Sequence, residues 1–204
     1  MNVVQMNFII YIYEVFYLAK MIENPKQLIL NKSKEILYTE GYKKLSMRNI
    51  AKACNIAIGT IYNYYSTKKD LVIEMMTEYW EEYFCVVEKL INSNDNFYIK
   101  LNNIFNELSI FIKTFKEVWL KAEFYDTPDY ITSGVEKESI YIEKLIRKIE
   151  DILIKEASNK NSAIHIKLDS YETAKFILMN FITMIRMPFF QYSSFECFLK
   201  ELLK

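Results

Sequence analysis

Apolar residues recur at helical spacing through most of the chain, and polar breaks divide the pattern into separate segments. The clearest breaks lie at residues 92–96, 126–129, 133–134 and 159–162. Within the segments, steps of three and four residues separate the apolar positions, which is typical of helices that bury one face. The pattern therefore predicts an all-α protein.

The breaks and capping residues set the expected bounds of each helix. Helices are expected over residues 25–40, 46–54, 58–65, about 68–91, 97–124 (as one helix or two), from 135 onward, 170–187 and 194–204. Ser193 and Glu196 have the spacing of a capping box, which predicts that the last helix starts after Ser193. The segment 170–187 is apolar almost all round, which predicts burial on every side.

Composition supports a helical chain with an aromatic interior. Only three Gly and three Pro occur among 204 residues, too few for the many tight turns of a sandwich or barrel. The chain also holds 16 Tyr, 14 Phe and nine Met, so its core is expected to be rich in aromatic and flexible apolar side chains.

Residues 46–65 have the pattern of two short helices joined by a tight turn. Ala51 is a small residue where two helices can approach closely, and Asn55 stands where the turn requires a positive φ. Ile61 and Tyr65 face inward on the second helix. Such a helix-turn-helix can present the polar edge of its second helix to the major groove of DNA.

Charge is distributed unevenly, although the whole chain is neutral. Residues 21–71 carry nine basic and four acidic side chains, a net charge of +5, and residues 72–204 carry a net charge of −5. A basic N-terminal part next to an acidic remainder indicates that the first part binds a polyanion. Lys43, Lys44, Lys52 and Lys69 are expected to form a solvated face that raises the long-range attraction to DNA.

The stretch LSMRNIAKACNIAIGTIYNYYSTKKDLV resembles the DNA-binding domain of TetR-family transcriptional regulators. The matching positions are Gly41-Tyr42, Ile50-Ala51, Gly59-Thr60-Ile61-Tyr62, Tyr65, Lys68 and Leu71. The resemblance implies an all-α fold with an N-terminal three-helix helix-turn-helix DNA-binding domain, residues 21–67. A C-terminal helical ligand-binding and dimerisation domain follows, residues 68–204. Residues 1–20 are expected to form an N-terminal extension of unknown role, either an extra helix packed on the body or a segment upstream of a functional chain that starts at Met21.

The resemblance also implies which residues meet double-stranded DNA. The expected DNA-binding residues are Ser46, Met47, Arg48, Gly59, Thr60, Tyr62, Asn63, Tyr64 and Lys68. Ser46 caps its helix and Lys68 pairs with a phosphate, whereas Tyr64 is either a contact or a core residue. Two positions depart from the family pattern: Ala57 stands where Ser often caps, and Ile58 replaces a basic or polar residue. The Ala57 departure costs about 1 kcal/mol of helix capping.

A homodimer is expected, because one recognition helix reads too few base pairs for selectivity. The helices at 170–187 and 194–204 carry more apolar surface than one protomer needs, so they are expected to form a four-helix interface. The candidate interface residues are Phe181, Ile185, Phe195, Phe198, Leu199 and Leu202. The alternative is that these helices pack inside a monomer.

The aromatic content suits a cavity for an apolar or aromatic small molecule. The candidate ligand-binding residues are Trp80, Phe84, Phe105, Trp119, Phe124, Tyr141, Phe176, Asn180, Met184 and Arg186. For the apolar members the alternative is ordinary core packing. Asn180 and Arg186 stand out as polar residues within an apolar helix, where a buried polar group needs a partner.

These observations predict a cytoplasmic homodimeric regulator, a repressor released from a near-palindromic operator by a small-molecule ligand. The alternatives are a ligand-independent repressor or activator, and a membrane-associated helical protein suggested by the apolar run at residues 8–19. Catalysis is not expected, because one His and no P-loop or GxGxxG motif occur. No metal site, cofactor or membrane partner is expected either, and the three Cys have no metal-ligand spacing.

Overall fold

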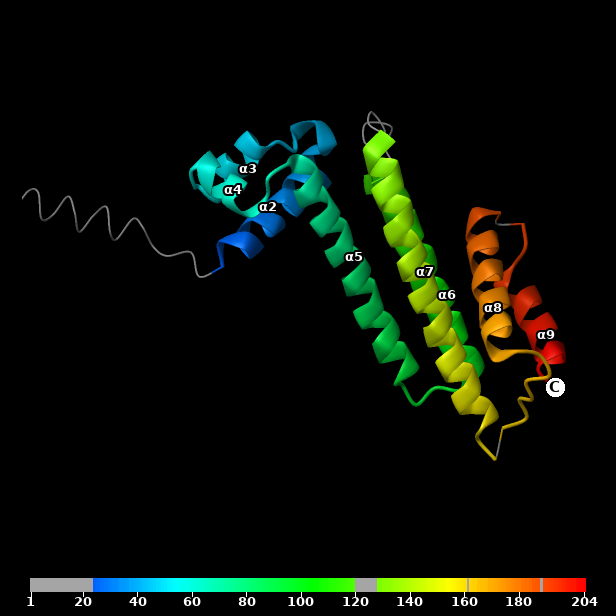
Figure 1. Ribbon diagram of the computed structural model, residues 1–204. Helices are drawn as coiled ribbons and strands as arrows, with labels where there is room; N and C mark the ends of the chain where they lie inside the picture. Colours follow the sequence, from blue (N-terminus) through cyan, green and yellow to red (C-terminus); the bar gives the residue numbers. More distant parts are fainter. Residues whose placement is uncertain (1–23, 120–127, 161, 188) are drawn as a thin grey trace, which may run out of the picture. The chain divides into compact units, whose positions relative to one another are not determined.

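The computed structural model describes residues 24–119, 128–160, 162–187 and 189–204; for Lys116, Val118, Trp119 and residues 128–138 it describes the backbone alone. The described residues form helices and no strand (Figure 1). The chain divides into two compact units between Lys68 and Lys69. The fold is therefore all-α with two parts.

The described part of unit 1 forms four elements, whose ends follow from local chemistry. They are α2 (Pro25–Glu40), the 3-10 turn η1 (Tyr42–Lys44), α3 (Met47–Cys54) and α4 (Ile58–Tyr64). Asn24 caps α2 by accepting the Gln27 N–H at 3.1 Å, and proline fits the first turn of that helix. Gly41 ends α2 with φ 84°, a conformation that glycine adopts without steric cost.

The core of unit 1 is made by the inward faces of these elements. Its buried side chains include Ile29, Leu30, Ile36, Leu37, Leu45, Ile50, Ile61 and Tyr65. Helix α3 contacts both α2 and α4, so it lies at the centre of the unit. This packing holds α4 against α3.

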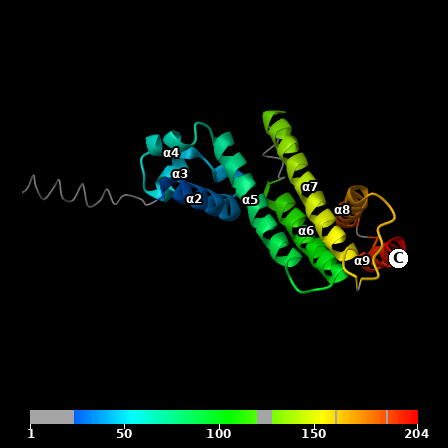
Figure 2. The ribbon, with the colours of Figure 1, turned by 60° about the horizontal axis from the view of Figure 1, so that its bottom comes forward.

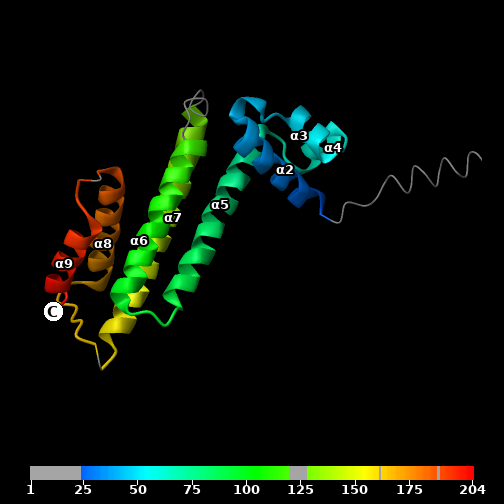
Figure 3. The same ribbon diagram turned by 180° about the vertical axis from the view of Figure 1, so that it is seen from behind.

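Unit 2 contains five longer helices. They are α5 (Lys68–Ile91), whose first residue is the last of unit 1, α6 (Phe97–Trp119), α7 (Pro128–Ala157), α8 (Ser170–Arg186) and α9 (Tyr192–Leu202). Helices α5, α6 and α7 lie side by side, and α8 and α9 form a pair beside α6 and α7 (Figures 2 and 3). One continuous core of buried side chains joins the five helices.

Two expected helix boundaries are wrong. Helix α7 begins at Pro128 and continues through Ser133 and Gly134, where a break was expected. Helix α9 begins at Tyr192 with Gln191 as its N-cap, so Ser193 does not start the helix.

The earlier start of α9 has a visible cause in the packing of Tyr192. The Tyr192 ring stacks on Phe105 of α6 at 5.0 Å between centroids, and it lies 6.0 Å from the Phe181 ring of α8. These contacts place Tyr192 in helix α9, although it lies one position before Ser193, the expected cap. Tertiary packing therefore overrides the local capping signal here.

Helix α8 is buried on one side only. Ala174, Ile177, Leu178 and Phe181 face the core, whereas Phe176 and Met179 remain exposed within the single chain. The expectation of burial on every side is wrong for the isolated protomer. Its exposed apolar face is available to another molecule.

Candidate nucleic-acid interface

Helices α3 and α4 form a helix-turn-helix whose geometry follows from three side chains. Ser46 accepts the Asn49 N–H at 3.2 Å and caps α3, as expected. Asn55 ends α3 in the left-handed region with φ 53°, which confirms the positive φ predicted for the turn. Ile61 is fully buried and anchors α4 against α3. The helix-turn-helix predicted from the sequence is therefore present.

Helix α4 begins without a side-chain cap. The side chain of its N-cap residue, Ala57, has no hydrogen-bonding group. The Thr60 N–H donates to the backbone carbonyl of Ala57 at 2.9 Å. This agrees with the expected loss of capping at Ala57. The helix is held by packing on α3 instead.

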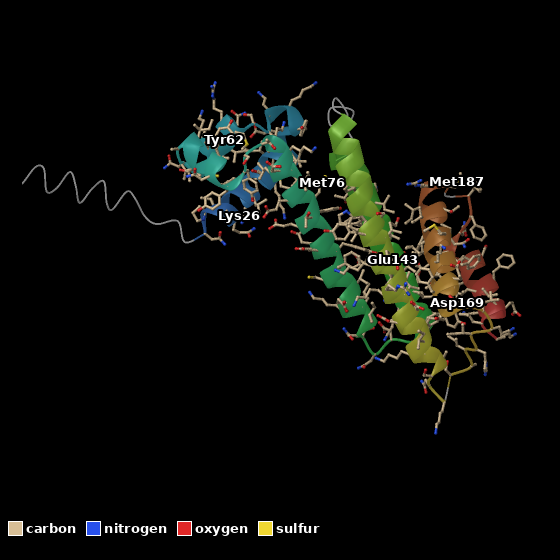
Figure 4. The ribbon with its side chains drawn as sticks, viewed as in Figure 1. Lys26, Tyr62, Met76, Glu143, Asp169 and Met187 are labelled. Atoms are coloured by element: carbon tan, nitrogen blue, oxygen red, sulfur yellow. The ribbon has the colours of Figure 1, made fainter. Side chains whose placement is uncertain are left out.

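One face of α4 is open to solvent and carries most of the expected DNA contacts. Ile58, Gly59, Tyr62 and Asn63 are exposed along this face, and Thr60 is half-buried. The Tyr62 side chain projects from unit 1 (Figure 4). A Cβ at Gly59 would meet no atom within 4 Å, so another molecule can approach the backbone closely there. The face has the size and polarity to enter a major groove.

Tyr64 is exposed, so the structure answers the question that the sequence left open about its burial. Its side chain is 42% exposed, and it is therefore not a core residue. It lies two positions after Tyr62, however, and residues two apart on a helix do not share a face. Tyr64 consequently flanks the face that Tyr62 occupies.

Met47 and Arg48 are neighbours on α3 with opposite environments. Met47 is only 8% exposed and packs in the core of unit 1, one turn from Ile50 and Ala51. Its burial leaves little of the side chain for the DNA contact that was expected there. Arg48 is exposed, and no described residue forms an ion pair with it. Its charge is available to a polyanion.

Lys68 makes an internal contact that the sequence did not predict. Its Nζ donates to the Tyr42 carbonyl at 3.3 Å and lies 3.5 Å from the centroid of the Tyr42 ring. Burial lowers the pKa of this ammonium. The expected role in phosphate pairing thus competes with a contact inside unit 1.

In unit 2, three of the candidate ligand residues come together. Trp80 lies 4.8 Å from Tyr141 and 6.3 Å from Phe84, measured between ring centroids. Phe111 and Tyr83, which the sequence did not single out, complete this aromatic cluster. The buried Tyr83 hydroxyl has no hydrogen-bond partner in the described part of the chain. Burial, together with the nearby charge of Glu107, raises the pKa of Tyr83.

The other candidate ligand residues do not join that cluster. The Phe105 ring lies 5.3 Å from the Phe181 ring, measured between centroids, and Met184 is buried in the core of unit 2. Asn180 donates its side-chain amide to the Phe176 carbonyl at 2.8 Å on its own helix, so it needs no ligand to satisfy it. Phe176 and Arg186 are exposed. The side chain of Trp119, and all of Phe124, lie outside the described residues.

The candidate dimer residues divide by exposure. Phe181, Phe195 and Leu199 are at most 2% exposed and belong to the protomer's own core. Ile185 and Leu202 are half-buried, and Phe198 is 69% exposed. The sequence missed three exposed apolar side chains near them: Met179, Met187 and Phe189. Met187 follows the end of α8, as Figure 4 shows. Their exposure depends on tertiary packing, which spacing alone does not reveal.

Searches for two other kinds of site gave no candidate. No helix in the described ranges has both the length and the apolar character to cross a membrane. Among the same residues, no group of three or more His, Cys, Asp or Glu side chains is placed to hold a metal ion.

A hollow of about 250 Å³ is lined by Phe97, Lys100, Ile152, Lys155, Glu156 and Asn159, none of which was a candidate ligand residue.

Comparison with known proteins places the helix-turn-helix in a family. The family described as "Bacterial regulatory proteins, tetR family" matches residues 29–75. The uncharacterized HTH-type transcriptional regulator YuxN of Bacillus subtilis is 26% identical over 74 residues, which cover 36% of this chain and 25% of YuxN. The chain thus matches only a quarter of that relative's length.

Solved structures share the fold over most of the chain. A transcriptional regulator of Cytophaga hutchinsonii has a TM-score of 0.61 at 18% identity, over 86% of this chain and 91% of its own. The transcriptional regulator FadR of Bacillus subtilis, solved in complex with stearoyl-CoA, has a TM-score of 0.51 at 18% identity, over 78% and 84%. The fold similarity therefore extends beyond the helix-turn-helix into unit 2.

Proposed function

From the match of residues 29–75 to the tetR family of bacterial regulatory proteins, we propose that the chain is a TetR-family regulator, a homodimeric repressor of a near-palindromic DNA operator. The observation that carries the proposal is the open face of α4, held rigidly by the packing of Ile61 and by the left-handed turn at Asn55. A rigid helix with an uncovered polar face is what major-groove reading requires.

We assign different parts of the interface to different features of DNA. Thr60 and Asn63 have short polar side chains that suit base edges, and the Tyr62 hydroxyl suits a phosphate or sugar. Gly59 lets the duplex backbone approach α4. Arg48 adds a charge from α3. Ile58, which is 42% exposed, suits a thymine methyl group.

We propose that the exposed apolar face of α8 and α9 pairs with the same face of a second protomer. Phe198 and Phe189 are 69% and 85% exposed, and Phe176 and Met179 add to this apolar surface. Apolar side chains exposed to this degree favour burial against a partner. A two-fold axis at this face would bring four helices together and give the DNA two recognition helices.

We propose release by a small ligand that binds in unit 2. The aromatic cluster around Trp80 and the unpartnered buried Tyr83 hydroxyl support a site for an apolar molecule with a polar group. The fold similarity to FadR with stearoyl-CoA makes a long-chain acyl thioester the first ligand to test. Such a ligand changes DNA affinity only as far as it distinguishes two states of the dimer.

The role proposed is binding rather than catalysis, and the location proposed is the cytoplasm. A DNA regulator works where the chromosome lies, and Cys54, Cys85 and Cys197 are free thiols, as expected in a reducing compartment. A ligand-independent repressor or an activator would use the same helix-turn-helix. Release or retention of DNA in the presence of acyl thioesters separates these roles.

The direct test is selection of duplexes from a random-sequence pool by the full chain, followed by fluorescence anisotropy with the selected site. We expect a near-palindromic site and about tenfold or greater weakening on Asn63→Ala, because a base-edge contact is lost. Asn94→Ala, an exposed position in the loop between α5 and α6, is the matched control and should bind as the parent does. Failure to enrich any duplex would contradict the proposal.

A further inference from the structure

The ammonium group of Lys68 is held at two points by Tyr42, a residue 26 positions earlier in unit 1. One point is the Tyr42 carbonyl, 3.3 Å from Nζ, and the other is the face of the Tyr42 ring, 3.5 Å from Nζ to the centroid. The face of an aromatic ring attracts a cation through its quadrupole. Both contacts use the cationic end of the side chain, so its charge is directed at Tyr42.

Tyr42 is the first residue of η1, and this turn is fastened on two sides. Its carbonyl accepts the Leu45 N–H at 3.1 Å in addition to Lys68. At the other end of the turn, the Asn49 side chain of α3 donates to the Lys44 carbonyl at 2.8 Å. Lys68 and Asn49 therefore fix a three-residue turn that carries basic side chains.

Lys44 is the cation that this turn presents. Its side chain is exposed, and no residue in the described ranges forms an ion pair with it. The hydrogen bond from Asn49 places its backbone next to the first turn of α3, on which Arg48 is also exposed. An exposed cation on a fixed backbone can neutralise a phosphate without a further cost in backbone conformational entropy.

We propose that Lys68 is a positioning residue for DNA binding, which holds η1 through Tyr42 so that Lys44, and not Lys68, neutralises a DNA phosphate. The inference rests on the proposed DNA-binding function. It reverses the expectation from the family resemblance, in which Lys68 itself pairs with the phosphate. The half-buried position of Lys68 and the lowered pKa of its ammonium agree with a charge that is used inside the protein.

The two roles differ in how binding depends on salt. Each phosphate that a protein cation neutralises contributes about 0.9 to the slope of log affinity against log salt concentration. A direct contact contributes this amount whatever happens at other positions. A positioning residue contributes through Lys44, so its effect on the slope disappears once Lys44 has been replaced.

The experiment measures anisotropy of a labelled mixed-sequence duplex of about 30 base pairs, long enough for two half-sites, with the full chain. Salt is varied from about 50 to 200 mM. Because a dimer carries two Lys44 side chains, Lys44→Gln should reduce the magnitude of the slope by about 1.8, which is about 0.9 per protomer. Lys68→Met and Tyr42→Leu should each weaken binding about fivefold, comparable to loss of one cation–π pair. In the Lys44→Gln background, Lys68→Met should leave the slope unchanged.

Tyr42→Phe is the matched control, since it retains the ring and the carbonyl and should bind within about twofold of the parent. Thermal unfolding of every variant identifies any that fails to fold, and Lys68→Gln, which also removes the charge, then replaces Lys68→Met in the same comparison. A further fall of about 1.8 in the magnitude of the slope, about 0.9 per protomer, on Lys68→Met in the Lys44→Gln background would overturn the inference. If the parent protein binds no duplex, both the proposed function and this inference fail.

Discussion

The indole ring of Trp80 on α5 stacks on the phenol ring of Tyr141 on α7, with centroids 4.8 Å apart and ring planes inclined by only 6°. The Phe111 ring of α6 packs against the same indole, with centroids 4.4 Å apart. The three rings therefore join three helices of unit 2. A ligand that entered between these helices, as proposed, would have to separate the rings, and this would link its binding to the spacing of the helices.

Tyr141→Leu should lower the free energy of unfolding by about 1 kcal/mol, because the aromatic pair is lost while apolar volume is kept. Urea unfolding followed by circular dichroism measures this change. Tyr141→Phe retains the stacked ring and should unfold within about 0.5 kcal/mol of the parent. Equal stability of all three proteins would mean that the stack does not join the helices.

Gly59→Ala should separate DNA binding from stability. The added Cβ meets no atom within 4 Å in the free protein, and alanine is the better helix former by about 1 kcal/mol. We therefore expect unchanged or greater thermal stability. DNA affinity should fall about tenfold, because the methyl group would lie between α4 and the duplex. Parental affinity measured by anisotropy would show that DNA does not approach this position closely.

Glu143 and Tyr171 should make the packing of α8 on α7 sensitive to acid. The Tyr171 hydroxyl donates to the Glu143 carboxylate at 2.6 Å, where α7 faces α8 (Figure 4), and Arg147 donates to the same carboxylate at 2.9 Å. The hydrogen bond from Tyr171 is the main cause that lowers the pKa of Glu143, and the hydrogen bond and charge of Arg147 add to it.

A lowered pKa in the folded state gives stability that is present above the unfolded pKa of about 4.3 and is lost as pH falls through the lower folded value. The parent should therefore lose thermal stability more steeply on acidification than Glu143→Gln does. Glu117→Gln, an exposed position on α6, is the control and should follow the parent. Parallel curves for the parent and Glu143→Gln would contradict the role of this hydrogen bond.

Phe198→Glu should dissociate the proposed dimer. The side chain is 69% exposed in the protomer, and a carboxylate in an apolar interface loses its hydration without gaining a partner. We expect at least about tenfold weaker self-association by sedimentation equilibrium. Ile110→Glu changes a similarly exposed residue on α6, 60% exposed, and should leave the dimer intact. Dissociation by Ile110→Glu alone would move the interface away from α8 and α9.

The helix-turn-helix was predictable because its signals are local. Ser46 caps the helix that follows it, Asn55 tolerates the positive φ of the turn, and the spacing of Ile61 puts it on the inner face of its helix. Each of these features depends on a few neighbouring residues, so sequence spacing is enough to place them.

Features that depend on tertiary contacts were missed. The packing of Tyr192 moved the start of α9 ahead of the Ser193 signal. Met47 faces the core because tertiary contacts decide which side of α3 packs inward. Its position next to Arg48 in the sequence does not reveal that side. The contact of Lys68 with Tyr42 joins residues 26 positions apart, and the periodic spacing of the sequence does not indicate such a pair.

The central claim is that two copies of this chain place two α4 helices on one DNA duplex. Native mass spectrometry of the full chain with its selected duplex tests this claim most directly, because it counts the chains in each complex. We predict two chains per duplex, and loss of that complex on Phe198→Glu. A complex with a single chain, or free duplex and free protein even at low salt, would contradict it.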